Sequence, residues 1–415
     1  MNQLIATLAA FLCIPVLLRF KVKLSYTIAV TTGILAVLSC IGMPAVGQVV
    51  AGLFTHAPSR DTILTVLLVS VVGGTMKHYG VLDRIVTSIL ALVSSKKTVL
   101  VIIPSLIGTL IIPGGAILSA PFVDEIGADA GLAPARRAAV NLVFRHVAMI
   151  LFPFSSTILL IRSSLPHINI YWVLLLTLIF LLLALTVAYF LYLKNIQPEP
   201  ASKDHLTVHR ALHLRHLFLD TAPIYVPVLI NAATGLPFYM TMLVSIGIVY
   251  LQSNRHRFFQ VLRESASWDT VLIIVAVLLM KDIILQMGDL LMLFDAIFAA
   301  SNSSLSVMGV FMATSLFFGF ITGNINAPLA VTLPMLIRIS TDMTMVQLHI
   351  FAYFLLISAF LGYYFSPLHL CQTFTLKMMK VTTGQLYREY RLYAPATVLI
   401  LMVTTLSLLT LVRSW

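Results

Sequence analysis

The sequence predicts an all-α polytopic membrane protein. It is expected to contain two inverted repeats, each with five transmembrane spans and one re-entrant hairpin, with interrupted helices at the mid-membrane. Three observations predict this fold: the hydropathy, the sorting of basic residues and the recurrence of one segment. Of the 415 residues, 60% are hydrophobic and 10% are charged, and the mean hydropathy is +1.01. Soluble domains carry about 25% charged residues.

Apolar runs recur along the whole chain, most of them long enough to cross a hydrocarbon core about 30 Å thick. Two runs, at about 98–127 and 306–338, hold turn-forming residues near their centres and are predicted to be re-entrant hairpins, which enter and leave on one side. The other ten are predicted to be full spans, at about 2–19, 26–53, 62–93, 138–162, 169–193, 218–235, 238–252, 269–298, 345–376 and 394–412.

With these spans the lysines and arginines gather on one side, which the positive-inside rule makes cytoplasmic. Loops such as TGLPF (234–238), poor in basic residues, fall on the other side. Ten spans and two hairpins put both termini outside. If either hairpin were a full crossing, the basic loops after it would lie on the opposite side of the membrane from those before it. The net charge of +11 is therefore interpreted as a loop bias that sets topology, with no nucleic-acid partner.

One segment recurs in the second half of the chain. DTILTVLLVSVVGGTMKHYGVL begins at Asp61 and DTVLIIVAVLLMKDIILQMGDLL begins at Asp269, and the same offset of 208 residues relates Gly115 to Gly323. An odd number of full spans separates the copies, so the second copy is inverted. The predicted division is a first repeat at 1–194, a cytoplasmic linker at 195–217 and a second repeat at 218–415. Inverted repeats with interrupted helices are typical of secondary transporters.

Four breaks come in two pairs: the two hairpin tips, and the interrupted spans at about 138–162 and 345–376. Backbone can be irregular at membrane depth where it lines a polar cavity. Helix N-termini there attract anions, and free carbonyls can hold a cation. The alternative interpretation is a set of kinks that only aid packing. The predicted substrate- and ion-binding residues are Pro113, Gly114, Gly115, Ser119, Pro153, Ser155, Ser156, Thr157, Thr322, Gly323, Asn324, Asn326, Ser366, Pro367, His369 and Gln372.

PGGAILSAPFVDEIG (113–127) and FRHVAMILFPFSSTILL (144–160) carry a resemblance to the ion transporter superfamily, which includes citrate, C4-dicarboxylate, gluconate and arsenite carriers. Within it, the chain is most similar to a prokaryotic integral-membrane family of undefined function. The resemblance implies a scaffold domain and a mobile domain that carries the hairpins and broken helices. It also implies elevator-type alternating access, a homodimer and a location in the prokaryotic plasma (inner) membrane.

Three basic residues within predicted spans are further candidates. Lys77 and Lys281 occupy comparable places in the two repeats, each predicted to lie roughly 18–22 Å deep, and could attract an anion or carry a proton. The alternative for both is a structural ion pair with a nearby aspartate. Arg145 could guide an anion, although a side chain that reaches the lipid headgroups is slightly favoured. His369 is either a proton acceptor or a hydrogen-bonded histidine in a polar pocket.

The expected function is secondary active transport of a small organic anion, with a carboxylate favoured, coupled to H⁺ or Na⁺. The alternatives are an ion-only Na⁺/H⁺ antiporter and, less favoured, a lipid translocator or membrane enzyme. No nucleotide-binding or nucleophile motif indicates an enzyme, and no cofactor or metal is expected. The stretch from His205 to His216 is interpreted as an amphipathic helix on lipid headgroups in preference to a metal site. Membrane lipid and the small-molecule anion are the expected partners.

Overall fold

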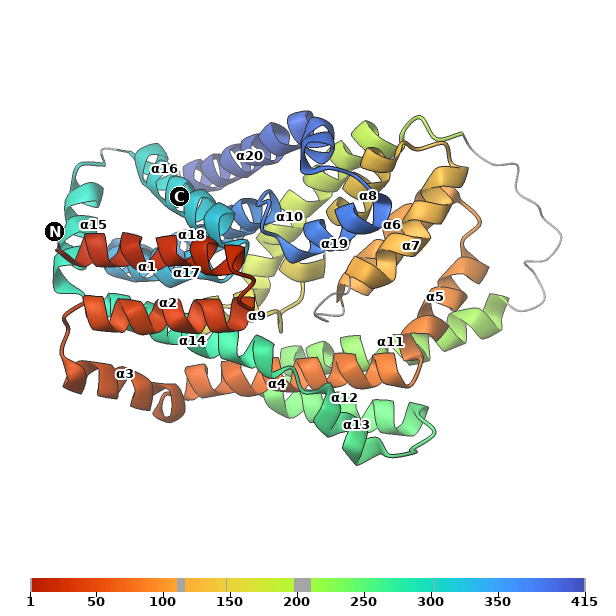
Figure 1. Ribbon diagram of the computed structural model, residues 1–415, viewed down its shortest axis with the longest axis horizontal. Coiled ribbons are helices and arrows are strands. Elements are labelled where there is room, and N and C mark those ends of the chain that lie inside the picture. Colours follow the sequence, from red (N-terminus) through yellow and green to blue (C-terminus); the bar gives the residue numbers. More distant parts are fainter. Residues whose placement is uncertain (1, 110–115, 147, 198–209, 302, 414–415) are drawn as a thin grey trace.

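The protein is helical throughout the part of the chain that the computed structural model describes, which is residues 2–109, 116–146, 148–197, 210–301 and 303–413. Those residues form 20 α-helices and no strand (Figure 1). The first half contains α1 (Asn2–Arg19), α2 (Leu24–Leu38), α3 (Met43–Thr55), α4 (Ala57–His78), α5 (Val81–Leu92), α6 (Lys96–Thr109), α7 (Ala116–Asp129), α8 (Pro134–His146), α9 (Ser156–Ser164) and α10 (Ile170–Ala188).

The second half contains α11 (Arg210–Thr234), α12 (Phe238–Gln252), α13 (Phe258–Ser265), α14 (Trp268–Leu285), α15 (Gly288–Ala299), α16 (Ser304–Thr322), α17 (Ala327–Ile339), α18 (Met345–Tyr364), α19 (Leu370–Met379) and α20 (Thr383–Arg413). Short 3₁₀ turns lie at Ala148–Ile150 and Ser340–Asp342, and a π-helical turn (Tyr189–Leu193) extends α10.

Among the described residues, six helices are long and apolar enough to cross a bilayer, namely α4, α10 with its π-helical end, α11, α16, α18 and α20. The pair α14 and α15 would make a seventh span, bent by 76° at the break between them. The chain therefore has the features of a polytopic helical membrane protein, as its composition predicts.

Three predicted spans are wrong as continuous helices. The span at 26–53 divides into α2 and α3, 62–93 into α4 and α5, and 269–298 into α14 and α15. At the first break Gly42 has φ +86° and precedes a helix that carries proline in its first turn. At the second, Gly80 has φ +65°, a left-handed conformation that suits glycine. Hydropathy did not reveal these turns because each lies within a long run that is apolar on average.

One arm of a predicted hairpin is longer than expected. The 19-residue helix α16 is long enough by itself to cross a bilayer. The other three arms, α6, α7 and α17, have 14, 14 and 13 residues, which at about 1.5 Å per residue fall short of the hydrocarbon thickness.

The helix α18 lies at the centre of the packing. Thr344 and Gln347 form a capping box at its start, and every residue from 350 to 364 is buried. Its close crossing with α16 depends on two glycines, because a Cβ on Gly319 would lie 2.8 Å from the Tyr363 nitrogen and one on Gly362 would lie 2.7 Å from the Ser315 oxygen. Small residues at such crossings let two membrane helices approach closely.

Helices from the two halves of the chain pack against each other. The first-half helix α2 packs along α14, and α4 packs along α12 (Figure 1). The helices α7, α8 and α19 form a second group of contacts (Figure 1). The four predicted breaks lie among α6–α9 and α16–α19, so the packing brings segments from both halves together.

Candidate functional site

The tip of the second predicted hairpin meets the first interrupted span through Asn326. The Asn326 carboxamide accepts a hydrogen bond from the Thr157 hydroxyl (3.0 Å) and donates one to the Ser156 hydroxyl (3.1 Å). Asn326 and Thr157 are both buried. These bonds join segments about 170 residues apart in the chain, so the structure brings two of the four predicted breaks into direct contact.

Both segments present the start of a helix at this contact. Ser155 is the N-cap of α9, where its hydroxyl accepts a hydrogen bond from the Ile158 amide. Asn326 is the N-cap of α17 but does not cap with its own side chain. Instead the Asn324 carboxamide oxygen accepts from the backbone amides of Asn326 and Ala327, which leaves the Asn326 side chain to reach α9. Two helix N-termini, with their partial positive charges, therefore lie side by side.

The same hairpin tip also contacts the second interrupted span. Gly323 ends α16 in a left-handed conformation (φ +59°), and a Cβ there would lie 2.7 Å from the Leu368 carbonyl carbon. The Ser366 hydroxyl donates to the Phe320 carbonyl (2.5 Å). The Thr322 hydroxyl donates back to Phe318 within its own helix. The tip is thus packed between the two interrupted spans.

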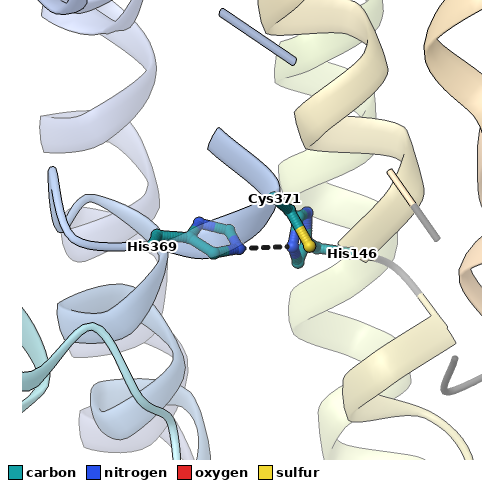
Figure 2. A group of neighbouring side chains, drawn as sticks. All are labelled: His146, His369 and Cys371. Atoms are coloured by element: carbon teal, nitrogen blue, oxygen red, sulfur yellow. Dashed lines mark hydrogen bonds between the residues drawn. The ribbon is translucent and has the colours of Figure 1, made fainter. Parts of the chain in front are cut away.

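A second polar contact joins α8 to the break before α19. His146 Nε2 lies 3.0 Å from His369 Nε2, and both rings are buried. Figure 2 shows the two imidazoles meeting beside Cys371. Two turns along the same interface, the Asn141 amide donates to the Thr375 hydroxyl (2.9 Å). Gln372 lies between His369 and Thr375 on α19, three residues from each.

Several buried polar atoms around this interface have no hydrogen-bond partner among the described residues. They are Ser119 Oγ on α7, Asn141 Oδ1 on α8, and both the oxygen and the nitrogen of the Gln372 carboxamide. The three side chains are 0% exposed. Buried polar groups normally find a partner, so this interface is polar beyond what its own helices satisfy.

The remaining predicted residues differ in their placement. Pro113, Gly114 and Gly115 lie outside the described residues. Pro153 is buried just before α9, whereas Pro367 is exposed at its break.

The basic candidates separate into three environments. Lys77 is exposed in the last turn of α4, next to the break at Gly80, and is not in the middle of a continuous helix. Lys281 is buried and forms an ion pair with Asp282 (2.5 Å). This is the structural ion pair given above as the alternative for Lys281. The pair lines a cavity of about 310 Å³. Arg145 is only 5% exposed, so the expectation that it reaches the lipid headgroups is wrong.

Four residues at this interface were not among the predicted site residues, namely His146, Asn141, Thr375 and Cys371. His146 and Asn141 lie on α8, and their partners on α19 are 223 and 234 residues away in the chain. No spacing rule relates residues so far apart. The available signal was that His146 and Asn141 are polar residues within a predicted span.

The fold and the site define a polytopic helical membrane protein with a buried polar centre at interrupted helices. Residues 4–411 match a family described as "Protein of unknown function (DUF401)". The match covers nearly the whole chain, and the protein belongs to that family. No curated protein gives a significant match to the sequence.

Proposed function

We propose that the protein is a secondary active transporter of a small organic anion, with a carboxylate as the expected substrate. Coupling to H⁺ or Na⁺ would drive it through an elevator-type alternating-access cycle. One observation carries the proposal: Asn326 joins the N-terminal ends of α17 and α9 at a buried point, through the hydroxyls of Ser156 and Thr157.

Such a junction favours an anion of low charge. Two helix N-termini supply partial positive charge, while hydroxyl and carboxamide groups supply directional hydrogen bonds. The buried side chain of Arg145, in the last turn of α8, adds a formal positive charge near the breaks. Few fixed charges surround the junction, which favours a monoanion or small dianion over a highly charged solute.

The order of the helices supports the proposed inverted repeat. The succession α1–α10 recurs as α11–α20, and α6 begins at Lys96 while α16 begins 208 residues later at Ser304. The break between α4 and α5 at Gly80 has its counterpart between α14 and α15 at Gly288, at the same offset. Repeats with discontinuous helices at a shared site are a common plan of secondary transporters, in line with the resemblance to the ion transporter superfamily.

Unequal packing of the two hairpins supports alternating access. The helix α17 packs against α14, whereas its counterpart α7 makes its main contacts with α6, α8 and α19. A carrier that moves one group of helices against another is expected to show such a difference in any single state. Under this proposal α1–α5 and α11–α15 form the scaffold, and α6–α9 and α16–α19, which carry the hairpins and the two interrupted spans, form the mobile part of each subunit of a homodimer.

Solute uptake into proteoliposomes tests the proposal. Purified protein would be reconstituted and offered a panel of small carboxylates with an imposed Na⁺ or pH gradient of either direction. The proposal predicts gradient-dependent accumulation of at least one carboxylate and none in protein-free vesicles. Na⁺/H⁺ exchange with no organic solute present would instead identify an ion-only antiporter, and accumulation of no carboxylate under either gradient would contradict the proposal.

A further inference from the structure

Three metal-binding side chains converge where α8 meets the break before α19. A ligand atom from each of His146, His369 and Cys371 lies within 4.8 Å of the other two. The two histidines are buried and the cysteine is half-buried. Figure 2 shows the two imidazole rings steeply inclined to each other, with an interplanar angle of 74°, and the Cys371 sulfur beside them.

We infer that His146, His369 and Cys371 form a binding site for Zn²⁺ or a closely similar transition-metal ion. Two imidazole nitrogens and one thiolate are a common donor set for Zn²⁺. The inference goes beyond the proposed function and does not depend on it, because metal binding can be measured without transport.

The hydrogen bonds of His146 prepare it as a ligand. Its Nδ1 lies 2.5 Å from the Leu142 carbonyl oxygen, and a carbonyl only accepts, so Nδ1 carries the proton and Nε2 carries the lone pair. Metal-binding histidines usually donate their second ring N–H to a carbonyl or carboxylate in this way, which fixes the ring. The lone pair on Nε2 points to His369.

His369 can become the second ligand by a change of tautomer. Without metal, its Nε2 donates its proton to His146 Nε2 across 3.0 Å. Its Nδ1 has no hydrogen bond among the described residues. With the proton on Nδ1, both Nε2 lone pairs would face the same point.

The spacing suits a small metal ion. Two nitrogens bound to tetrahedral Zn²⁺ at about 2.0–2.1 Å are about 3.3 Å apart. The observed 3.0 Å between the Nε2 atoms would therefore open by a few tenths of an ångström, and both rings would turn until their lone pairs converge on an ion beside the line that joins the two nitrogens. Cys371 would supply the third ligand after losing its thiol proton to solvent. A water molecule or a solute oxygen would complete the coordination.

The Cys371 thiolate is the only one of the three proposed ligands that carries a negative charge. The positive charge of Arg145 acts on both imidazoles and opposes a second cation beside them. A thiolate offsets one positive charge, whereas two neutral imidazoles offset none. Loss of Cys371 should therefore weaken metal binding more than a simple reduction from three ligands to two.

Metal binding to the purified, chelator-treated full chain tests the inference. Co²⁺ should bind with one equivalent per chain and produce the absorption of a tetrahedral, thiolate-bound ion, and Zn²⁺ should displace it. Cys371→Ser should remove the thiolate absorption and lower Zn²⁺ affinity by about 100-fold or more, since even outer partners of a metal ligand are worth about 10–100-fold. Cys13→Ser and Cys40→Ser are matched controls and should leave both signals unchanged.

A second measurement uses wild-type protein and so does not depend on the folding of a variant. Zn²⁺ should slow alkylation of Cys371 and leave the rate at Cys40 unchanged, while Mg²⁺ and Ca²⁺, which prefer oxygen ligands, should protect neither. Absence of thiolate absorption with Co²⁺, or Zn²⁺ affinity that is equal in wild type and Cys371→Ser, would overturn the inference and leave His146 and His369 as a buried hydrogen-bonded pair.

Discussion

At the scale of single residues, two asparagines at one hairpin tip have different roles. The Asn324 side chain satisfies the first amides of α17, which frees the Asn326 side chain to bind Ser156 and Thr157. The polar junction between the two helix starts therefore depends on Asn326, and the local stability of α17 depends on Asn324. The sequence TGNINAP contains both residues but does not distinguish their roles.

Asn326→Ala should weaken ligand binding by at least tenfold in affinity, because it separates the two helix starts that we propose bind the anion. It should also lower the free energy of unfolding by about 1–3 kcal/mol, since the buried Thr157 hydroxyl and the partly buried Ser156 hydroxyl lose their partner. Ligand affinity and thermal stability of the purified variant provide the two readouts.

Asn231→Ala is the matched control for this variant. Asn231 is also buried, and its carboxamide accepts from the Tyr171 hydroxyl and donates to the Leu236 carbonyl, but it lies on α11 away from the breaks. It should lose a similar amount of stability and keep wild-type affinity. If Asn326→Ala bound the ligand as tightly as Asn231→Ala does, the junction would not be the ligand site.

At the scale of helices, the turn between α16 and α17 depends on one glycine. Gly323 combines a positive φ with close contact to Leu368 on the facing break. Any other residue at this position would have a strained backbone conformation, and its Cβ would clash with the backbone of Leu368. The angle between the hairpin tip and the second interrupted span is thus set by the absence of a Cβ.

Gly323→Ala should destabilise the protein by about 1–3 kcal/mol, the usual cost of a strained left-handed residue, and should reduce solute uptake. Gly309→Ala is the control in the same helix, where an added Cβ meets nothing within 4 Å. It should be neutral or stabilising by about 0.5–1 kcal/mol at most. Comparable melting temperatures for the two variants would contradict the account of this turn.

The ends of helices were easier to predict from the sequence than the contacts between distant helices. Helical breaks follow local rules, so the sequence TGNINAP predicted the end of α16 and the start of α17. The break at Gly80 was missed because a single glycine is compatible with a continuous membrane helix. The predicted site included both Asn326 and Thr157, but not the hydrogen bond between them. The contact of His146 with His369 was not predicted at all, because it depends on how distant helices pack and no local pattern carries that information.

At the scale of the whole molecule, the central question is how the chain is arranged across the membrane. The basic loops predict that the ends of the first hairpin, α6 and α7, return to the cytoplasmic side. The loop between α9 and α10 is predicted to lie outside. The inverted repeat requires both placements, because a full crossing at α6 and α7 would give the two halves the same orientation.

Cysteine accessibility in intact cells checks this topology. In a background without the three native cysteines, Ser94→Cys and Ala133→Cys flank the first hairpin, and His167→Cys lies after α9, all at exposed positions. A membrane-impermeant thiol reagent should label only His167→Cys in intact cells and all three after lysis. Labelling of Ser94→Cys and Ala133→Cys from opposite sides would show that the hairpin is a full crossing.

The measurement that tests the central claim most directly is the thermal stability of purified wild type and Asn326→Ala against a panel of small carboxylates, with and without Na⁺. A ligand that binds only the folded state stabilises it by about 2.7 kcal/mol at 100 times its dissociation constant. The account predicts that at least one carboxylate raises the melting temperature of the wild type and has little effect on Asn326→Ala. A panel that leaves the wild type unchanged, or that stabilises both proteins equally, would contradict an anion site at the junction of α9 and α17.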